Sequence, residues 1–377
     1  MQASLFSPSR RALATTAILS FAAFIGSTAF AGKPTLNDGN IRISSNENAF
    51  GFSPKALERM KEVLDSGNYY NNNESGELAK VLAAYEGVPL EYIMPTAGSG
   101  PVLDLTAMSH AAAGLNVVST ETGYAQLVTR FKAFGGDVKL APLSEKMGYD
   151  FKALGKLIDD KTAIVYICNP NNPTGVLADP VELKNFILSV PENVLVFMDE
   201  AYLELSDTGL AANTQAALVK VRKNMIVSRT FSKAHAMAGL RVGYAIGNPE
   251  VLAKLRKYSS GGPSYLACVG AIESIKDKEH MASNVKKYIE VRNYVKAEFD
   301  RMGIKYAQPS GSFVYFNAGM KRNDVVKKLQ ASKVIIGGIR GGVDDPTGGG
   351  EWTRVSLGTM EEMSIFIGEL SKILGKS

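Results

Sequence analysis

Hydrophobic and polar positions along most of the chain predict two kinds of segment. Short apolar runs, typical of buried strands, alternate with longer stretches of helical periodicity. Strands are expected at 91–95, 116–120, 137–142, 162–168, 194–198, 224–228 and 241–246, and amphipathic helices at 77–85, 125–134, 180–190 and 212–221. This alternation predicts an α/β fold, a three-layer sandwich whose mostly parallel sheet is covered by helices on both faces.

The pattern changes after residue 258. A long helical region is expected from about Leu266 to Met302, followed by strands near 312–317, 334–339 and 353–357 and a closing helix from about Met360. Helices beside a small antiparallel sheet predict a second, smaller α+β domain. We therefore expect a large domain at 67–258 and a small domain at 259–377, with residues 32–66 packing on the small domain.

The first 31 residues have the pattern of an export signal. A serine and two arginines at 9–11 precede a nearly uncharged run over 12–30, which ends in an Ala-x-Ala site at 29–31. These features are typical of a twin-arginine signal peptide. An uncleaved membrane anchor is the alternative, because the run is nearly long enough to span a bilayer. Its many small and hydroxyl residues favour cleavage after Ala31, so we expect a periplasmic or otherwise exported protein with no membrane attachment after cleavage.

Composition and charge argue against several classes of protein. The chain has 377 residues, of which 45% are hydrophobic and 21% charged, as in an ordinary globular protein. Its net charge of +5 is modest, and no basic cluster with interleaved aromatic residues suggests a nucleic-acid partner. Two cysteines and three histidines without ligand-like spacing predict neither a disulfide framework nor a metal site. We assign no role to either cysteine.

Two turns follow predicted strands at the sheet edge where open α/β folds bind ligands. The small-residue turn at 96–101 opens a helix and can present free N–H groups to a phosphate. The turn Asn-Pro-Asn-Asn-Pro-Thr-Gly at 169–175 is fixed by two prolines, and its amides can donate to a phenolate oxygen. A plain connection between strand and helix is the alternative for each.

A third polar segment, Asp199-Glu200-Ala201-Tyr202, follows the expected strand at 194–198. A carboxylate at the end of a buried strand is costly unless it meets a cation, and a protonated ring nitrogen is such a partner. Solvation at the strand end is the alternative for Asp199. Tyr202 can offer its hydroxyl to the same ligand or serve as a core tyrosine.

The fourth segment, residues 227–247, carries Lys233 after a strand. An amine forms a Schiff base with a carbonyl, and the nearby Thr230, Ser232 and Arg241 suit a phosphate. Most lysines are solvated surface groups, so Lys233 gains significance only from the other three segments. Together the four segments supply a ring-nitrogen partner, a phenolate partner, an imine-forming amine and a phosphate site, which are the requirements of pyridoxal phosphate.

The order and spacing of these motifs resemble the fold-type I aminotransferases of class I/II, and among them the histidinol-phosphate aminotransferase branch. The matching motifs are NEN at 46–48, NPNNPTG at 169–175, DEAY at 199–202, TFSKA and AGLRVGYAIG within 230–247, and WTRVSLGT at 352–359. The resemblance covers the chain from about Ile43 to its C-terminus. It implies an aspartate aminotransferase-like fold and pyridoxal 5'-phosphate as cofactor. Two departures border the expected substrate entrance, namely Ala49 after NEN and the Ser-Gly-Pro turn at 99–101, where relatives often carry acidic residues.

The resemblance also implies roles for individual residues. Lys233 would form the Schiff base and move the proton, and Asp199 would pair with the ring nitrogen. The other cofactor contacts implied are Asn172 and Tyr202 on the ring oxygen, Tyr124 stacked on the ring, and Ser99, Gly100, Ser232 and Arg241 on the phosphate.

Two further positions bear on substrate and assembly. Arg354 matches the arginine that grips the substrate carboxylate, a bidentate task that suits a guanidinium. Tyr70 matches a tyrosine that reaches the phosphate from the other subunit, which implies a homodimer with shared active sites. The expected reaction moves an amino group from an amino donor to a 2-oxo acid. A lyase or racemase on the same fold and a non-catalytic exported binding protein are the alternatives.

Overall fold

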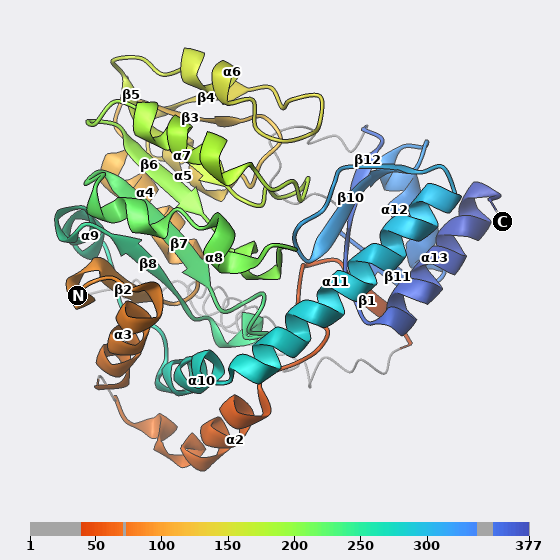
Figure 1. Cartoon of the computed structure of the whole chain (residues 1–377), viewed down its shortest axis with the longest axis horizontal. Coiled ribbons are helices and arrows are strands. Elements are labelled where there is room, and N and C mark those ends of the chain that lie inside the picture. The colour runs from red at the N-terminus through yellow and green to blue at the C-terminus, as the bar shows by residue number, and fades with distance from the viewer. Residues whose placement is uncertain (1–38, 71–72, 338–349, 377) are drawn as a thin grey trace, which may run out of the picture. The chain divides into compact units, whose positions relative to one another are not determined.

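The computed structural model describes residues 39–70, 73–337 and 350–376. From Arg42 onward the chain forms one compact unit (Figure 1). The described strands form a seven-stranded sheet, a three-stranded sheet and a two-stranded sheet. The predicted α/β class is therefore confirmed. The expected signal peptide and its cleavage site lie outside the described residues.

The seven-stranded sheet is mixed but mostly parallel. Its spatial order is β2 (Ile93–Thr96), β8 (Gly243–Gly247), β7 (Met225–Thr230), β6 (Leu195–Asp199), β5 (Thr162–Cys168), β3 (Asn116–Thr120) and β4 (Asp137–Ala141). Strand β8 pairs antiparallel with both of its neighbours, and the pairings among the other strands are parallel. The carboxyl ends of β5, β6 and β7 consequently meet at one edge of the sheet, where the predicted motifs follow them.

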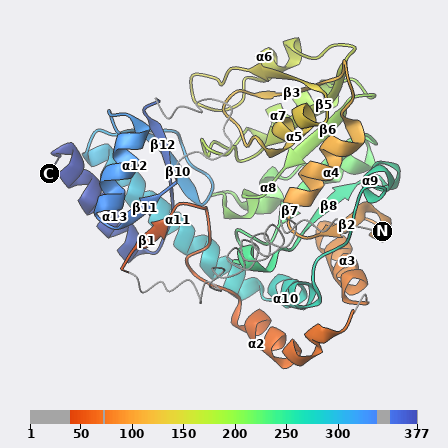
Figure 2. The same ribbon diagram turned by 180° about the vertical axis from the view of Figure 1, so that it is seen from behind.

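Helices cover both faces of this sheet, as the sequence predicts (Figures 1 and 2). One core cluster joins the sheet to α3 (Asn73–Glu86), α6 (Phe151–Lys156), α7 (Pro180–Ser189) and α10 (Tyr265–Lys276), and the other joins it to α4 (Gly100–His110), α5 (Gln126–Ala133) and α9 (Pro249–Arg256). Strand β5 shows the reason, because its side chains alternate between the two faces. Ile164 and Tyr166 belong to one cluster, and Val165 and Ile167 to the other.

The smaller domain contains a three-stranded antiparallel sheet and a two-stranded sheet. Strand β10 (Phe313–Asn317) lies between β9 (Lys305–Tyr306) and β12 (Trp352–Ser356), and β1 (Ile41–Ile43) pairs with β11 (Val334–Ile336). Helices α11 (Lys278–Arg301), α12 (Arg322–Ala331) and α13 (Met360–Leu374) lie beside these strands (Figure 1). The remaining elements are α2 (Pro54–Glu62), α8 (Gly209–Asn213) and the 3-10 helices η1 (Leu64–Asn68), η2 (Leu90–Tyr92), η3 (Leu203–Leu205), η4 (Ala216–Lys220) and η5 (Ala238–Leu240).

The long helical region expected from Leu266 to Met302 is divided into α10 and α11. The break falls at Asp277, whose backbone leaves the helical region with φ −85° and ψ 66°. Its carboxylate accepts hydrogen bonds from Ser53 (2.6 Å) and Lys55 (3.2 Å), so a contact distant in sequence holds the chain at the break.

Helix α10 also changes the expected domain boundary. The sequence assigns residues 259–377 to the small domain, but Ala267 and Ala271 of α10 pack in the core of the large sheet. The segment at 32–66 is expected on the small domain, and its described residues, 39–66, contact both regions. Its β1 pairs with β11, whereas α2 packs on α10.

Two other expected elements differ locally. The last strand of the large sheet begins at Gly243 rather than at Arg241, because Arg241 adopts a left-handed conformation with φ 57° and ψ 70°. The amphipathic stretch expected at 212–221 contains the end of α8 and the 3-10 helix η4 instead of one α-helix.

A buried ion cluster fixes the sheet edge that carries the motifs. The fully buried guanidinium of Arg229 on β7 lies 2.9 Å from Glu200, 3.5 Å from Glu86 and 3.7 Å from Glu204. It also donates to Thr214 (2.9 Å). Burial raises the pKa of Glu204 to about 7, while Arg229 opposes that shift. Removing one partner of such a pair costs about 3–5 kcal/mol, since the remaining charges stay buried. The cluster therefore holds the turn after β6 against β7.

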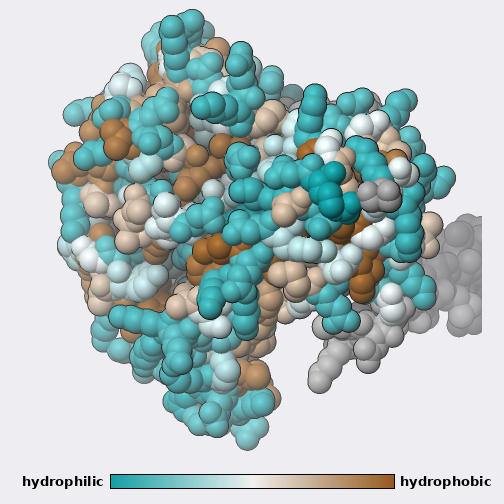
Figure 3. Space-filling view, turned by 45° about the vertical axis from the view of Figure 1, so that its right-hand side comes forward, coloured by the Kyte–Doolittle hydropathy of each residue, from teal (hydrophilic) through white to brown (hydrophobic). Residues whose placement is uncertain are grey.

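Polar residues cover most of the face seen in Figure 3, and hydrophobic residues there form small separate patches. Within the described ranges, no helix combines the length and the apolar character needed to cross a membrane.

Candidate functional site

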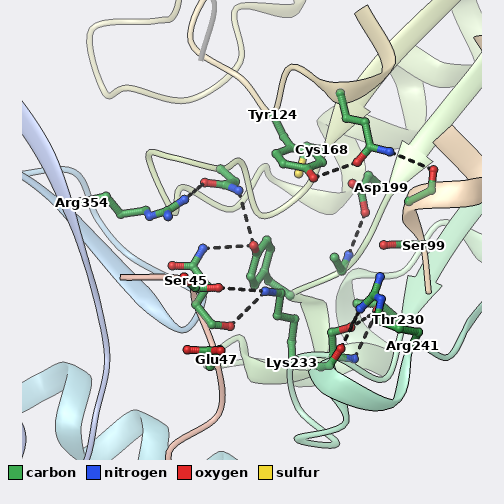
Figure 4. Close-up of a pocket in the computed structure, with 18 residues that line it drawn as sticks. Ser45, Glu47, Ser99, Tyr124, Cys168, Asp199, Thr230, Lys233, Arg241 and Arg354 are labelled. Atoms are coloured by element: carbon green, nitrogen blue, oxygen red, sulfur yellow. Dashed lines mark hydrogen bonds between the residues drawn. The ribbon is translucent and has the colours of Figure 1, made fainter. Parts of the chain in front are cut away.

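A cavity of about 440 Å³ opens at the carboxyl edge of the large sheet (Figure 4). The predicted site residues that line it are Ser99, Gly100, Tyr124, Asn172, Asp199, Tyr202, Thr230, Ser232, Lys233, Arg241 and Arg354. Tyr70 is not among the lining residues of this chain, and its side chain is fully exposed. The fold thus brings together residues that the sequence scatters over more than 250 positions.

Lys233 projects into the middle of the cavity from the turn after β7 (Figure 4). Its Nζ donates to the carbonyl oxygens of Asn46 (3.0 Å) and Ser45 (3.5 Å). Burial, together with the positive charge of Arg354, lowers the pKa of Lys233 to about 8, although Glu47 and Asp199 oppose the shift. A substantial fraction of the amine is therefore neutral near pH 8 and able to act as nucleophile or base.

Asp199 ends β6 and is 2% exposed. One of its carboxylate oxygens accepts a hydrogen bond from the backbone N–H of Ala201 (3.2 Å). Burial raises the pKa of Asp199 to about 7 in spite of the hydrogen bond from Ala201 and the charge of Lys233. A protonated ring nitrogen beside this carboxylate would lower its pKa again and stabilise the ion pair.

Tyr202 is held by two asparagines from different parts of the chain. Its hydroxyl accepts hydrogen bonds from Asn46 (3.1 Å) and from Asn172 (3.4 Å). Burial raises the pKa of Tyr202 above its usual value, so the phenol keeps its proton and can donate it to an anionic oxygen. Asn46 is fixed in turn by Ser356, whose hydroxyl donates to its side-chain oxygen (2.9 Å).

Arg354 enters the cavity from β12 of the small domain. It donates to the side-chain oxygen of Asn172 (2.6 Å) and to the carbonyl of Ser44 (3.1 Å). Its buried Nε finds no hydrogen-bond partner among the residues that the structure describes. A guanidinium that lines a cavity is suited to bind a carboxylate or another anion.

The far side of the cavity can hold a phosphate. Ser99 precedes α4 without a side-chain cap. Pro101 has no N–H and Val102 donates to the carbonyl of Ser99 (3.0 Å), so the N–H of Gly100 is the group at the helix start that is available to an anion. Arg241 donates to Ser232 (3.2 Å), and Thr230 donates to the same hydroxyl (3.0 Å).

Glycines make this close approach feasible. A Cβ atom at Gly98, whose φ is +89°, would overlap the guanidinium of Arg241. At Gly243 it would lie 2.7 Å from backbone atoms of Gly98 and Arg229. The phosphate turn can therefore lie against β8 only while these positions lack side chains.

Tyr124 lies beside the phosphate turn and donates its hydroxyl to Gln126 (2.9 Å). Burial, followed by the charge of Asp199, raises the pKa of Tyr124 to about 12. The ring is thus neutral and half-buried at the cavity wall, as stacking on an aromatic ligand requires.

Sequence reasoning assigned no role to several residues that line the cavity: Ser45, Asn46, Glu47, Gln126, Cys168, Ala201 and Ala238. Asn46 and Glu47 lie in the NEN motif, which is the one signal that pointed toward them. No local pattern distinguishes Gln126 or Cys168. Burial raises the pKa of the Cys168 thiol, so it is a neutral group in the cavity wall.

Comparison with known proteins supports the same chemistry. The model of the family Aminotransferase class I and II matches residues 39–370. Histidinol-phosphate aminotransferase 2 of Pseudomonas fluorescens is 33% identical over 337 residues, which are 89% of each chain. The protein of the same name from Carboxydothermus hydrogenoformans is 33% identical over 338 residues, which cover 88% of this chain and 91% of the relative.

A solved structure shows the same fold. The crystal structure of histidinol-phosphate aminotransferase from Sinorhizobium meliloti in complex with pyridoxal-5'-phosphate superposes with a TM-score of 0.81 at 24% identity, covering 89% of this chain and 91% of that one. The resemblance inferred from the motifs is therefore confirmed, and with it the aspartate aminotransferase-like fold and the cofactor. The chain belongs to the aminotransferase class I and II family and is a transaminase that depends on pyridoxal 5'-phosphate.

Proposed function

We propose that Lys233 attaches the cofactor and is the base of an amino-group exchange between an amino donor and a 2-oxo acid. The observation that carries this proposal is the position of its Nζ in one cavity with the Asp199 carboxylate and the Arg354 guanidinium. The fit to the cofactor rests on the uncapped start of α4, the glycine-lined approach of Arg241 and the buried carboxylate of Asp199.

Pyridoxal phosphate, when bound, supplies an electron-withdrawing ring that stabilises negative charge on the donor's α-carbon. Lys233 Nζ, released by the incoming amine, takes the proton from that carbon and later returns a proton. The carbonyl of Asn46, 3.0 Å away, orients the amine for this transfer. Asp199 would keep a ring nitrogen protonated, and Tyr202 and Asn172 would hold the ring oxygen.

Arg354 would bind the donor's anionic group. The residue lines the cavity, and its two hydrogen bonds to Asn172 and Ser44 fix the plane of the guanidinium. A guanidinium held in one plane can bind a carboxylate through two N–H groups and so orient the donor's α-carbon toward Lys233. Such orientation of reacting groups contributes substantially to enzymatic rate enhancement. The relatives' name suggests histidinol phosphate as one donor for assay, beside amino acids that carry a carboxylate.

The protein would act as a homodimer in which Tyr70 of one subunit completes the phosphate site of the other. Tyr70 is fully exposed and does not line the cavity of its own chain. Tyr69 beside it is 72% exposed and Leu64 is 58% exposed. Large apolar side chains exposed together are typical of an interface.

The N-terminal segment would direct the folded protein out of the cytoplasm through the twin-arginine route. The paired arginines, the apolar run and the Ala-x-Ala site support this proposal. An enzyme that holds a covalently attached cofactor benefits from a route that accepts folded proteins.

Replacing the two central residues should separate cofactor attachment from turnover. The Lys233→Ala protein should lose the visible absorption band of lysine-bound cofactor and transaminate about 10²–10⁴-fold more slowly, because its base is absent. The Asp199→Ala protein should keep that band and yet turn over much more slowly. Absorption spectra and steady-state assays check both, with Gln330→Leu on the exposed face of α12 as control. Normal spectra and turnover in Lys233→Ala would refute the proposal.

Cofactor capture should depend on pH through Lys233. The neutral amine reacts and the protonated amine does not, so the rate at which cofactor-free protein takes up pyridoxal phosphate should rise with pH through about 8. Arg354→Gln removes a positive charge that lowers the pKa of Lys233, and the midpoint should therefore move to higher pH. Stopped-flow absorbance measures the profile. Arg301→Gln, at a half-exposed surface ion pair, should leave the midpoint unchanged, and an equal shift in both variants would contradict this assignment.

Mixed dimers should reveal whether Tyr70 acts across the interface. When Lys233→Ala and Tyr70→Phe chains are combined, each mixed dimer should contain one intact site, so roughly half of the wild-type activity per mixed dimer should return. Purified heterodimers carrying two affinity tags allow the measurement. If Tyr70 serves its own subunit, mixing will restore nothing.

Export should require the paired arginines. Changing Arg10 and Arg11 to lysine should leave an uncleaved precursor in the cytoplasm, whereas the wild-type protein in the exported fraction should begin at Gly32. Cell fractionation with N-terminal sequencing checks this, and Arg42→Lys with Arg59→Lys is the control pair. Cleavage and export of the double-lysine precursor at the wild-type level would exclude the twin-arginine route.

A further inference from the structure

Gln126 lies at the start of α5 and lines the cavity between Tyr124 and the phosphate turn. Its side-chain nitrogen donates to the carbonyl of Gly100 (3.0 Å) and to the carboxylate of Asp104 (3.0 Å). Its side-chain oxygen accepts a hydrogen bond from the hydroxyl of Tyr124 (2.9 Å). Both N–H groups and the oxygen of the amide are therefore engaged, and they connect three points of the cavity wall.

The orientation of this amide is fixed by its neighbours. A backbone carbonyl and a carboxylate can only accept hydrogen bonds, so the nitrogen of Gln126 must face Gly100 and Asp104. Arg130 donates to the same carboxylate oxygen (3.1 Å). The oxygen of Gln126 consequently faces Tyr124, since a flipped amide would lose the hydrogen bonds to Gly100 and Asp104 and reverse the one with Tyr124.

This orientation determines what Tyr124 can offer. Its phenol is protonated, since its pKa is raised, and the proton points at Gln126. The hydroxyl is thereby directed along the wall, which leaves the ring face as the surface that Tyr124 presents to a ligand. The carbonyl that Gln126 binds belongs to Gly100, the first residue of α4 and part of the phosphate turn.

We propose that Gln126 is a positioning residue that joins the stacking face of Tyr124 to the phosphate turn at 99–100, so that ring and phosphate of the cofactor are held in one fixed relation. This inference rests on the proposed roles of Tyr124 and of the turn. Gln126 acts through Tyr124 and Gly100, and its substitution would weaken cofactor binding because both would lose the hydrogen bond that positions them.

Equilibrium binding of pyridoxal phosphate to cofactor-free protein tests the inference. Gln126→Leu keeps the size of the side chain and removes its hydrogen bonds, and the dissociation constant should rise about tenfold. Gln126→Glu should bind more weakly still, because a carboxylate cannot donate to Gly100 and repels Asp104. The circular dichroism of the bound cofactor should weaken in both variants as the ring loses its fixed orientation. Gln330→Leu on α12 is the matched control and should bind as wild type does.

A double-mutant cycle separates positioning from a general loss of structure. Tyr124→Phe keeps the ring and removes the hydroxyl, so the double variant with Gln126→Leu should bind no more weakly than Gln126→Leu alone. The melting temperature of each cofactor-free protein reports on folding. Two results would overturn the inference: additive losses of affinity in the double variant, or a dissociation constant for Gln126→Leu within twofold of wild type. Normal cofactor binding by the wild-type protein would in either case leave the proposed function intact. Failure of the wild-type protein to bind the cofactor through Lys233 would overturn both.

Discussion

The ion cluster around Arg229 is the interaction on which the geometry of the site depends. Neighbouring residues of a strand point to opposite sides, so Arg229 lies in the protein interior while Thr230 lines the cavity. The same holds one strand away, where Glu200 pairs with Arg229 and Asp199 lines the cavity. The buried pair thus connects the turn that follows Asp199 to the strand that leads to Lys233. Two acids besides Glu200 share this guanidinium, so any shift between the strands would leave several buried charges without compensation.

The sequence predicts the fold class and most of the site because these depend on local patterns. Apolar runs predict the strands of the sheet, and the polar residues directly after parallel strands lie at one edge of it. For this reason the sequence predicts that Asp199 and Lys233 lie in one site. Asn46 and Gln126 were assigned no role because their importance lies in their partners: Ser356 is 310 residues from Asn46, and no periodicity reports such a contact. The break at Asp277 and the left-handed Arg241 have the same origin, since tertiary hydrogen bonds and a crowded turn override helix and strand preferences there.

The site draws its charged groups from both domains, and this division has a chemical consequence. Asp199 ends β6, and Lys233 and Arg241 lie between β7 and β8, whereas Arg354 lies on β12 and contacts Asn172 of the large domain. The guanidinium proposed to bind the substrate is therefore placed by the packing of the small domain, while the groups proposed to bind the cofactor are placed by the large sheet. Asn172 belongs to both sets, because one end of its amide bonds Arg354 and the other bonds Tyr202. A movement of Arg354 on binding an anion would therefore act through Asn172 on the hydroxyl of Tyr202.

The arrangement of charge also relates anion binding to the strength of the base. Arg354 lies on one side of Lys233 and Arg241 on the other (Figure 4), and both lower the pKa of the amine. These arginines are the groups proposed to hold the substrate's anion and the cofactor phosphate. When each is neutralised by its anion, its effect on Lys233 weakens and the amine becomes more basic. With the proposed roles, the empty site would favour a neutral, nucleophilic amine for attaching the cofactor, and the filled site would favour a stronger base for removing a proton from carbon. One lysine could serve both steps, because the bound anions would neutralise the neighbouring arginines between them.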